Sequence, residues 1–275
     1  GHGAERVTSM LRQRYSDRVL TALQLEQRGT GDAARCGQAA LPTWNGWVAI
    51  IYGDSVLITA RAIAALVDQA RSHSGPLAML TATLADPTGY GRIVRDDAGH
   101  ALRVQEERDC SPIERAIREW NPGVYVVRAG FLREAVERLR PTNAQGELYL
   151  TDLVAMAAQS GGAATMHGDA AELYGINERH ELVQRERDLA RRIALEHLAR
   201  GVTIRDPERA RIEPSVHIEQ DVVIESGVEL RGDTTIARGA HIDVGCVLTD
   251  TIVQEDALVL PYTVANESVI GPASR

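Results

Sequence analysis

Residues 216–248 read VHIEQD-VVIESG-VELRGD-TTIARG-AHIDVG-CVL, and this stretch decides the fold of the second half of the chain. An aliphatic residue returns every six positions from Ile218 to Leu248, and a second series runs two places earlier, from Val216 to Cys246. Such hexapeptide repeats are typical of a left-handed parallel β-helix, in which each hexad forms one face of a triangular coil and the aliphatic residues point inward. Gly and Asp tolerate the backbone angles of the corners, which we expect at Asp221, Gly227, Asp233, Gly239 and Gly245.

A long charged segment precedes the repeats. Leu182, Leu189 and Ile193 give it a narrow apolar stripe at helical spacing, and Gly201 is a plausible stop. The pattern predicts a solvated linker helix over residues 180–200, followed by the start of the β-helix domain over 201–275.

The first part of the chain, residues 1–179, alternates between strand and helix patterns. The run 48–52 predicts a buried strand, and the run 59–70 predicts a helix with Thr59 as its N-cap. A short strand is also expected over 19–23. This alternation predicts an α/β domain with a mostly parallel sheet.

Two signals between Leu23 and Asp54 carry possible chemistry. The first is a turn in which two glycines flank Thr30, whose backbone N–H groups would be free to meet a base or a phosphate, although an ordinary loop fits equally well. The second is Asp54, just past the carboxyl end of the predicted strand, where open α/β sheets bind ligands. A carboxylate there suits Mg²⁺, which takes one or two carboxylates plus phosphate oxygens. The alternative is a solvated strand-end acid.

Composition excludes several classes of protein. The net charge of -8 argues against a broad nucleic-acid surface, and the 275 residues contain no run of 18 apolar residues, so we expect no membrane span. Cys36, Cys110 and Cys246 form no metal-ligand pattern, which fits a reducing cytoplasm. All thirty basic residues are arginines, so arginine must perform any phosphate binding by a basic side chain.

Along essentially its whole length the chain resembles the bacterial bifunctional N-acetylglucosamine-1-phosphate uridylyltransferase / glucosamine-1-phosphate N-acetyltransferase family. The motifs that carry the resemblance, in order, are Gln27-Arg28-Gly29-Thr30-Gly31, Tyr52-Gly53-Asp54, Asp86 to Ile93, Asn143-Ala144-Gln145-Gly146-Glu147, Tyr149-Leu150-Thr151-Asp152, Gly175-Ile176-Asn177 and Pro261-Tyr262-Thr263. The resemblance implies a partial nucleotide-diphospho-sugar transferase domain, Rossmann-like, joined by the linker helix to the hexapeptide β-helix.

The resemblance also implies roles for individual residues, none of them catalytic in the narrow sense. The nucleotide would be contacted by Gln24, Gly29, Thr30, Tyr52, Gly53 and Asp54, and the N-acetylated sugar by Gly91, Glu106, Asn121 and Asn177. Asp54 and Asn177 would bind Mg²⁺. Taken without the resemblance, Gly91 reads as a turn glycine, Glu106 as a surface acid and Asn177 as a helix N-cap.

The implied reaction joins UTP and N-acetylglucosamine 1-phosphate into UDP-N-acetylglucosamine and pyrophosphate, by in-line attack of the sugar phosphate on the α-phosphorus. The resemblance further implies a homotrimer. It leads us to expect truncation at both ends, without the family's Gly-rich loop with its lysine and without the acetyltransferase residues. Two alternatives stay open: a degenerate, non-catalytic module that binds a nucleotide sugar or only trimerises, and a relative that acts on another sugar 1-phosphate such as that of glucose.

Overall fold

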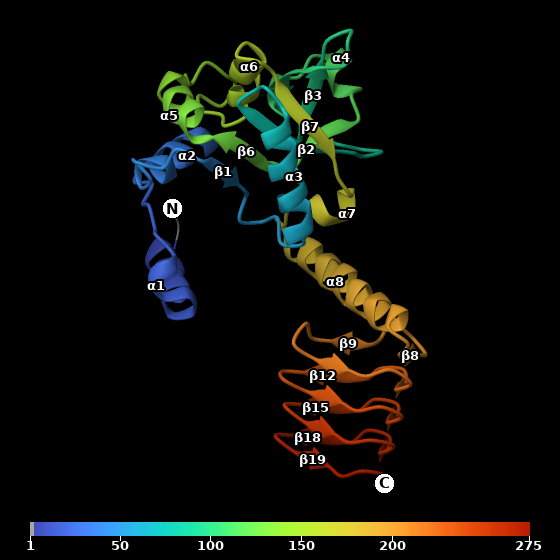
Figure 1. Cartoon of the computed structure of the whole chain (residues 1–275). Helices are drawn as coiled ribbons and strands as arrows, with labels where there is room; N and C mark the ends of the chain where they lie inside the picture. The colour runs from blue at the N-terminus through green and yellow to red at the C-terminus, as the bar shows by residue number, and fades with distance from the viewer. Residues whose placement is uncertain (1–2) are drawn as a thin grey trace. The chain divides into compact units, whose positions relative to one another are not determined.

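The computed structural model describes residues 3–275, and Gly1 and His2, which open the predicted first domain, lie outside the described residues. The chain divides into two compact units, the first ending at Ile176 and the second beginning at Asn177. Figure 1 shows the first unit in blue to yellow and the second in orange to red.

The first unit alternates helices and strands. Its elements in chain order are α1 (Ala4–Tyr15), η1 (Ser16–Arg18), α2 (Thr30–Ala39), β1 (Trp47–Ile50), α3 (Ala60–Ser72), β2 (Leu77–Thr83), β3 (Gly91–Arg95), β4 (Ala101–Gln105), η2 (Glu107–Asp109), α4 (Pro112–Arg115), β5 (Glu119–Asn121), β6 (Tyr125–Arg128), α5 (Ala129–Arg138), α6 (Asp152–Ala158), β7 (Ala163–His167) and α7 (Ala170–Leu173).

The strands of this unit, within the described residues, form one seven-stranded sheet in the order β1-β6-β2-β5-β3-β4, with β7 also paired to β2. The α/β class is confirmed, but the expectation of a mostly parallel sheet is wrong. Only β2 and β7 pair in parallel, because β6 lies antiparallel between β1 and β2, and β3, β4 and β5 form antiparallel pairs.

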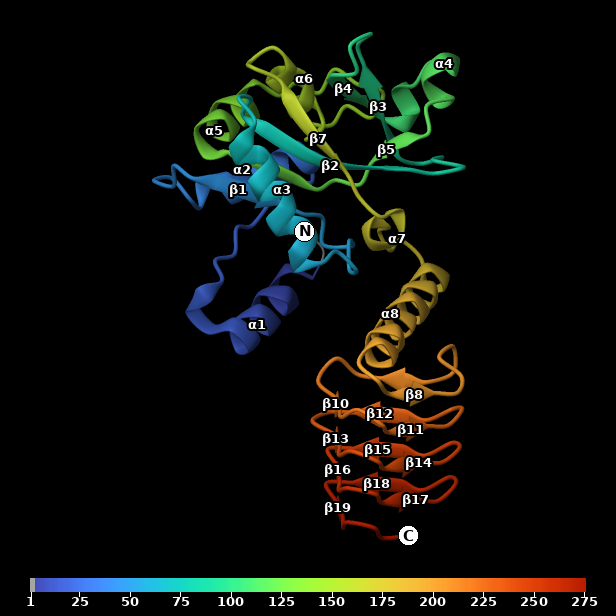
Figure 2. The same ribbon diagram turned by 45° about the vertical axis from the view of Figure 1, so that its right-hand side comes forward.

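Strands β2 and β6, in the middle of the sheet, are buried on both faces. Alternate residues of β2 enter different cores: Leu77 and Met79 pack with α5 and α6, whereas Ala78 and Leu80 pack with Leu66 of α3. A strand covered on both faces needs a continuous apolar run rather than an alternating one, which is the pattern these strands show. Figure 2 shows α3 crossing this sheet beside β2.

Of two further predicted elements, the helix over 59–70 forms and the strand over 19–23 does not. The predicted helix is confirmed as α3, and the Thr59 hydroxyl accepts a hydrogen bond from the Ala62 N–H at 3.2 Å, as an N-cap does. The short strand over 19–23 is wrong, because residues 19–23 form no strand and Leu20 and Leu23 are mostly exposed. The segment has apolar residues but no neighbouring chain to pair with among the described residues.

Strand β1 forms as predicted, but it is not buried. It pairs only with β6 among the described strands, so its other edge is free, and Ala49 and Ile51 are exposed. Free strand edges next to apolar surface promote edge-to-edge association.

We expect this free edge to drive self-association of the chain at high concentration. Ala49→Lys places a charge on the edge and should lower the fraction of aggregated protein in light scattering. Ile113→Lys, which removes a side chain that is 83% exposed on α4, is the matched control and should have a smaller effect. Equal effects of the two variants would contradict the edge as the cause.

The second unit is a helix followed by a stack of coils. Its elements are α8 (Arg179–Ala199), β8 (Thr203–Ile204), β9 (Arg211–Ile212), β10 (His217–Ile218), β11 (Val223–Ile224), β12 (Glu229–Arg231), β13 (Thr235–Ile236), β14 (His241–Ile242), β15 (Val247–Thr249), β16 (Ile252–Val253), β17 (Leu258–Val259), β18 (Val264–Asn266) and β19 (Val269–Ile270). Among the described residues these strands form three four-stranded parallel sheets. The left-handed parallel β-helix is therefore confirmed (Figure 2).

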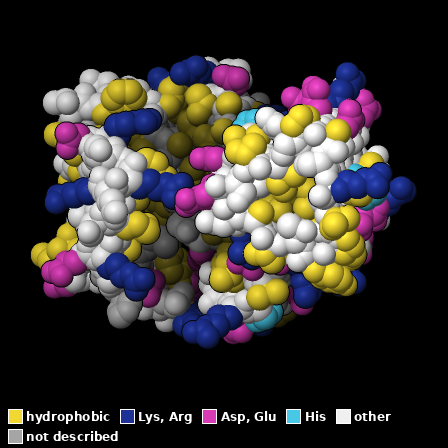
Figure 3. Space-filling view, turned by 90° about the horizontal axis from the view of Figure 1, so that it is seen from below, with side chains coloured by type: hydrophobic (Ala, Val, Ile, Leu, Met, Phe, Trp, Pro, Cys, Tyr) yellow, Lys and Arg dark blue, Asp and Glu magenta, His cyan; other side chains and the backbone are white. Residues whose placement is uncertain are grey.

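The two hexad series form the core of the β-helix. Val222, Ile224, Val228 and Leu230 have no exposed surface, so both series point inward. Val264 of β18 continues the outward-facing row of Val247 and is 77% exposed. Figure 3 shows hydrophobic side chains on the surface of the β-helix that is seen from below.

The corners follow the predicted positions with one exception. Asp221, Gly227, Gly239 and Gly245 have positive φ angles, but in the third hexad this conformation belongs to Gly232 rather than to Asp233. A Cβ at Gly232 would lie 2.1 Å from a carboxylate oxygen of Asp250, and φ is +60°, so a larger residue would strain the backbone and displace the Asp250 side chain.

Helix α8 ends against the β-helix core. Ala194 is fully buried in that core and His197 is 5% exposed, so one face of the helix packs against the β-helix. Burial lowers the pKa of His197, and the nearby Arg200 and His217 lower it further while Glu196 opposes them. The His197 Nδ1 atom has no hydrogen-bond partner among the described residues.

The lowered pKa of His197 predicts a pH-dependent stability of the second unit. Below the ordinary pKa of 6.5, His197 binds a proton in the unfolded chain but stays neutral in the folded unit. The free energy of unfolding therefore falls as the pH falls from 7.5 to 5. We expect a lower melting temperature at pH 5, and a smaller difference between the two pH values in His197→Leu. An unchanged pH dependence in that variant would contradict this assignment.

No helix within residues 3–275 combines the length and the apolar character needed to cross a bilayer.

Cys36, Cys110 and Cys246 are free thiols, and burial raises the pKa of Cys110 and of Cys246.

Candidate functional site

The glycine turn of the sequence docks on the segment that ends in Leu148. The Gly31 N–H donates to the Leu148 carbonyl oxygen at 2.8 Å, and the Leu150 N–H donates to the Thr30 hydroxyl at 3.1 Å. Cβ atoms at Gly29 and Gly31 would lie 2.6 and 2.9 Å from the Leu148 oxygen, so both positions need glycine. The Gly31 N–H is consequently not free for a base or a phosphate, so for this one group of the turn the expectation is wrong.

Gln24 lies beside this turn and holds it from the other side. Its amide nitrogen donates to the Gly29 carbonyl oxygen at 3.1 Å and to the Asp32 carboxylate at 2.9 Å. The hydrogen bond from Gln24 is the largest cause of the lowered pKa of Asp32, and Arg28 and Arg35 add to it. Because Asp32 is only 2% exposed, this ionised carboxylate anchors the start of α2.

A cavity of about 670 Å³ opens between α2 and β1. Four of the predicted nucleotide-binding residues line it: Thr30, Tyr52, Gly53 and Asp54. The rest of its wall is mainly apolar and comes from α2, β1 and α5. A mostly apolar cavity with a few polar groups at one side is the usual form of a small-molecule site.

Tyr52 interacts with three other residues that were predicted for the site, Thr30, Asp54 and Glu106. Its ring lies against Gly123, where a Cβ would be 2.4 Å from ring carbons and where φ is +77°. Burial raises the pKa of Tyr52 to about 12; a hydrogen bond with Thr30 opposes this, and the charges of Glu106 and Asp54 add to it. The fully buried Tyr125 adjoins Tyr52, and burial raises the pKa of its hydroxyl as well.

Glu106 lies at the end of β4, half-buried, and accepts a hydrogen bond from the Thr151 hydroxyl at 2.8 Å. A Cβ at Gly91 would lie 3.4 Å from a Glu106 carboxylate oxygen, so Gly91 leaves room beside that carboxylate. Glu106 also lines a second cavity, of about 240 Å³, with Thr151 and Asp152. Burial raises the pKa of Glu106, and Asp109 raises it further, although the hydrogen bond from Thr151 opposes this.

Asn121 ends β5 and is 7% exposed. Its side-chain oxygen accepts a hydrogen bond from the Gly123 N–H at 3.2 Å, which closes a tight turn through Pro122. This turn brings Asn121 and the Tyr52 ring to the same glycine. The sugar-site prediction for Asn121 stays a prediction.

Asp54 and Asn177 were predicted together as metal ligands. Asp54 is half-buried beside Gly175, where a Cβ would lie 3.0 Å from its carboxylate oxygen. Asn177 is exposed, and its N–H donates to Glu181 at 2.6 Å; the N-cap of α8 is Glu178, so the alternative reading of Asn177 as the N-cap is wrong. Within residues 3–275 no three His, Cys, Asp or Glu residues gather as a metal site. A single carboxylate still fits Mg²⁺ that is held mainly by substrate phosphates.

The structure brings three further residues to this region that the sequence predictions did not assign to it. Thr151 holds Glu106, Gly123 makes room for Tyr52, and Gly175 makes room for Asp54. Their contacts are long-range, so no local pattern would have identified them. The one available signal was that Thr151 and Gly175 lie inside motifs that already carried the resemblance.

Comparisons with known proteins identify the family of the chain. A family profile described as nucleotidyl transferase matches residues 2–171. A protein of Sorangium cellulosum (strain So ce56) named "Bifunctional protein GlmU" is 46% identical over 280 residues, which cover 100% of this chain and 59% of the relative. Proteins of the same name are 43% identical in Anaeromyxobacter sp. (strain Fw109-5), covering 100% and 58%, and 40% identical in Geobacter sulfurreducens (strain ATCC 51573 / DSM 12127 / PCA), covering 90% and 52%. The chain thus spans less than three fifths of the length of these relatives.

Proposed function

Because the chain belongs to the nucleotidyl transferase family, we propose that its first unit supplies the nucleotide and sugar pockets of a uridylyltransferase. The reaction would join UTP and N-acetylglucosamine 1-phosphate into UDP-N-acetylglucosamine and pyrophosphate. The observation that carries this proposal is Tyr52, which hydrogen-bonds with Thr30, a predicted nucleotide contact, and whose pKa is raised by the charge of Glu106, a predicted sugar contact. A transferase must hold its two substrates next to each other, and Tyr52 is where such substrates would meet.

On the nucleotide side, Thr30 and Tyr52 would bind and orient the uridine, with Gln24 and Gly29 fixing the turn that carries Thr30. The hydrogen bonds of Gln24 to Gly29 and Asp32 support a positioning role for its side chain. Gly53 lines the same cavity and would let the ligand approach the backbone closely.

On the sugar side, Glu106 would accept hydrogen bonds from sugar hydroxyl groups, and Asn121 would contact the N-acetyl group. Gly91 would leave space for the sugar ring beside the Glu106 carboxylate. The hydrogen bond from Thr151 supports a fixed acceptor at Glu106.

Asp54, with Asn177 as a further predicted ligand, would hold Mg²⁺. When bound, the ion would neutralise phosphate charge during the displacement. Among the described residues, no side chain forms a hydrogen bond or an ion pair with the Asp54 carboxylate. Its charge is therefore available to a metal ion, which supports this role.

Pyrophosphate release tests the proposal. We expect the highest rate with UTP, N-acetylglucosamine 1-phosphate and Mg²⁺, and lower rates when glucose 1-phosphate or ATP replaces the corresponding substrate. Equal rates with both sugar phosphates would favour a broader sugar 1-phosphate enzyme. Binding of UDP-N-acetylglucosamine without any release would favour the non-catalytic reading.

We further propose that the protein works as a homotrimer in the cytoplasm. The parallel β-helix and the exposed apolar side chains of Ile252 and Val269 support assembly, and the three free thiols suit a reducing compartment. Multi-angle light scattering that gives a monomer mass at micromolar concentration would contradict the trimer.

A further inference from the structure

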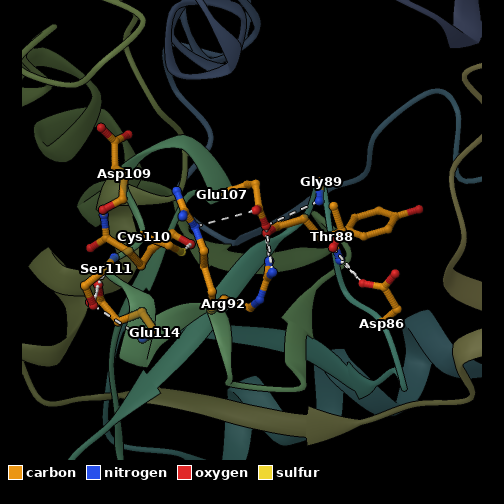
Figure 4. Close-up of polar contacts among 12 residues, drawn as sticks. Asp86, Thr88, Gly89, Arg92, Glu107, Asp109, Cys110, Ser111 and Glu114 are labelled. Carbon is orange, nitrogen blue, oxygen red and sulfur yellow. Dashed lines mark hydrogen bonds and ion pairs between the residues drawn. The ribbon is translucent and has the colours of Figure 1, made fainter.

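A buried ion pair lies behind the proposed sugar pocket. Arg92 of β3 is 1% exposed, and one of its terminal nitrogens lies 2.6 Å from the Glu107 carboxylate, whose side chain is 27% exposed. A second Arg92 nitrogen donates to the Tyr90 carbonyl oxygen. Figure 4 shows the guanidinium beside Glu107, with the turn that carries Thr88 and Gly89 on the other side.

The same carboxylate also holds the turn that leads into β3. The Gly89 N–H donates to the Glu107 Oε2 atom at 3.3 Å, so this one oxygen joins both Gly89 and Arg92 (Figure 4). Asp86 closes the start of the turn by accepting from the N–H and the hydroxyl of Thr88, at 3.0 and 2.6 Å. The turn and η2 are therefore linked through Glu107.

The members of this pair directly follow two of the predicted sugar contacts. Gly91 precedes Arg92 in β3, and Glu106 precedes Glu107. Because successive side chains of a strand point to opposite faces, Arg92 lies on the other face of β3 from the space beside Gly91. A Cβ at Gly91 would meet the Glu106 carboxylate oxygen at 3.4 Å, which is van der Waals contact, so displacing either partner of the ion pair would change the separation of Gly91 and Glu106.

We propose that the ion pair between Arg92 and Glu107 positions Gly91 and Glu106 for the N-acetylated sugar, a role that rests on the proposed function. The pair is a positioning device and touches no substrate itself. Its loss weakens binding of the sugar part of a nucleotide sugar and leaves binding of the uridine part unchanged. Breaking a buried pair is costly because one charge is left without its partner, so the pocket wall rearranges around it.

Calorimetric titration with UDP-N-acetylglucosamine and with UDP tests the proposal in the full chain. In Glu107→Gln we expect affinity for UDP-N-acetylglucosamine to fall about tenfold, the scale of a small misplacement of contacts, while affinity for UDP is kept. The matched control is Glu119→Gln. It breaks a second ion pair made by an arginine of β3, in which a terminal nitrogen of Arg95 lies 2.5 Å from a carboxylate oxygen of Glu119. The control should leave the ratio of the two affinities unchanged.

The outcomes separate the two proposals. An unchanged affinity ratio in Glu107→Gln, or an equal change in Glu119→Gln, overturns the role of the pair and leaves the proposed function standing. If the unaltered protein does not prefer UDP-N-acetylglucosamine over UDP, the proposed function fails and the role of the pair fails with it. If Glu107→Gln does not fold, Arg92→Lys carries the same test, because lysine keeps the charge but loses the planar fork.

Discussion

Asp54→Asn is expected to lower pyrophosphate release at least about 100-fold, because asparagine keeps the shape of the side chain but removes the charge that would hold Mg²⁺. The Asp54 carboxylate faces the 670 Å³ cavity and the space left by Gly175, and it shares its charge with no arginine among the described residues. The measurement is initial rate against Mg²⁺ concentration for both proteins.

A binding measurement makes this prediction independent of turnover. Mn²⁺ should broaden the NMR signals of the Tyr52 and Gly53 amides in the unaltered protein, and this broadening should disappear in Asp54→Asn. The control is Asp68→Asn, which alters an exposed acid of α3 and should change neither readout. Broadening that persists in Asp54→Asn would contradict the metal assignment.

Gly123→Ala should destabilise the first unit by about 2–4 kcal/mol, because it adds a left-handed backbone cost to a clash. The φ angle there is +77°, and the new Cβ would lie 2.4 Å from ring carbons of Tyr52. Since the ring would have to move, affinity for UDP should fall as well. Thermal unfolding and calorimetric titration measure the two effects.

A second substitution isolates the clash with the ring. In Gly123→Ala combined with Tyr52→Ala, the added methyl group has room, so the two changes should cost less together than the sum of their separate costs. Gly130→Ala on α5, where a Cβ meets nothing within 4 Å, is the control and should be neutral or slightly stabilising. Strict additivity would show that Tyr52 does not press on Gly123.

The β-helix was predictable because its signal is local and repeated. Each hexad from Val216 onward predicts the same two inward-facing positions and the same corner position. The structure has the residues in these positions, except that the corner of the third hexad falls at Gly232. At Gly232 the side chain of Asp250 in the next coil lies where a Cβ would be, as that of Asp256 does at the regular corner Gly239. A sequence pattern describes a strand and its corner, but not the atoms of the coil stacked on it.

The sheet of the first unit was less predictable. The run over 48–52 identified β1 as a strand, but nothing in that run shows that one edge of β1 is free or that its partner β6 runs antiparallel. Strand direction and burial depend on which strands meet, and those pairings join residues far apart in the chain.

In the candidate site, too, local sequence patterns were predictable and long-range contacts were not. Turn chemistry and the acid after a strand indicated Thr30 and Asp54 from the residues alone, whereas Glu106 and Asn121 came only from the resemblance. Neither source indicated that Thr151 holds Glu106, because that hydrogen bond joins residues 45 positions apart.

We expect one continuous site in the first unit to bind both a uridine nucleotide and an N-acetylated sugar. A crystal structure of the chain with UDP-N-acetylglucosamine and Mg²⁺ tests it most directly. The account predicts the uridine against Thr30 and Tyr52 and the sugar against Glu106 and Asn121. A nucleotide sugar bound elsewhere on the chain, or a uridine in place with its sugar directed away from Glu106, would contradict it.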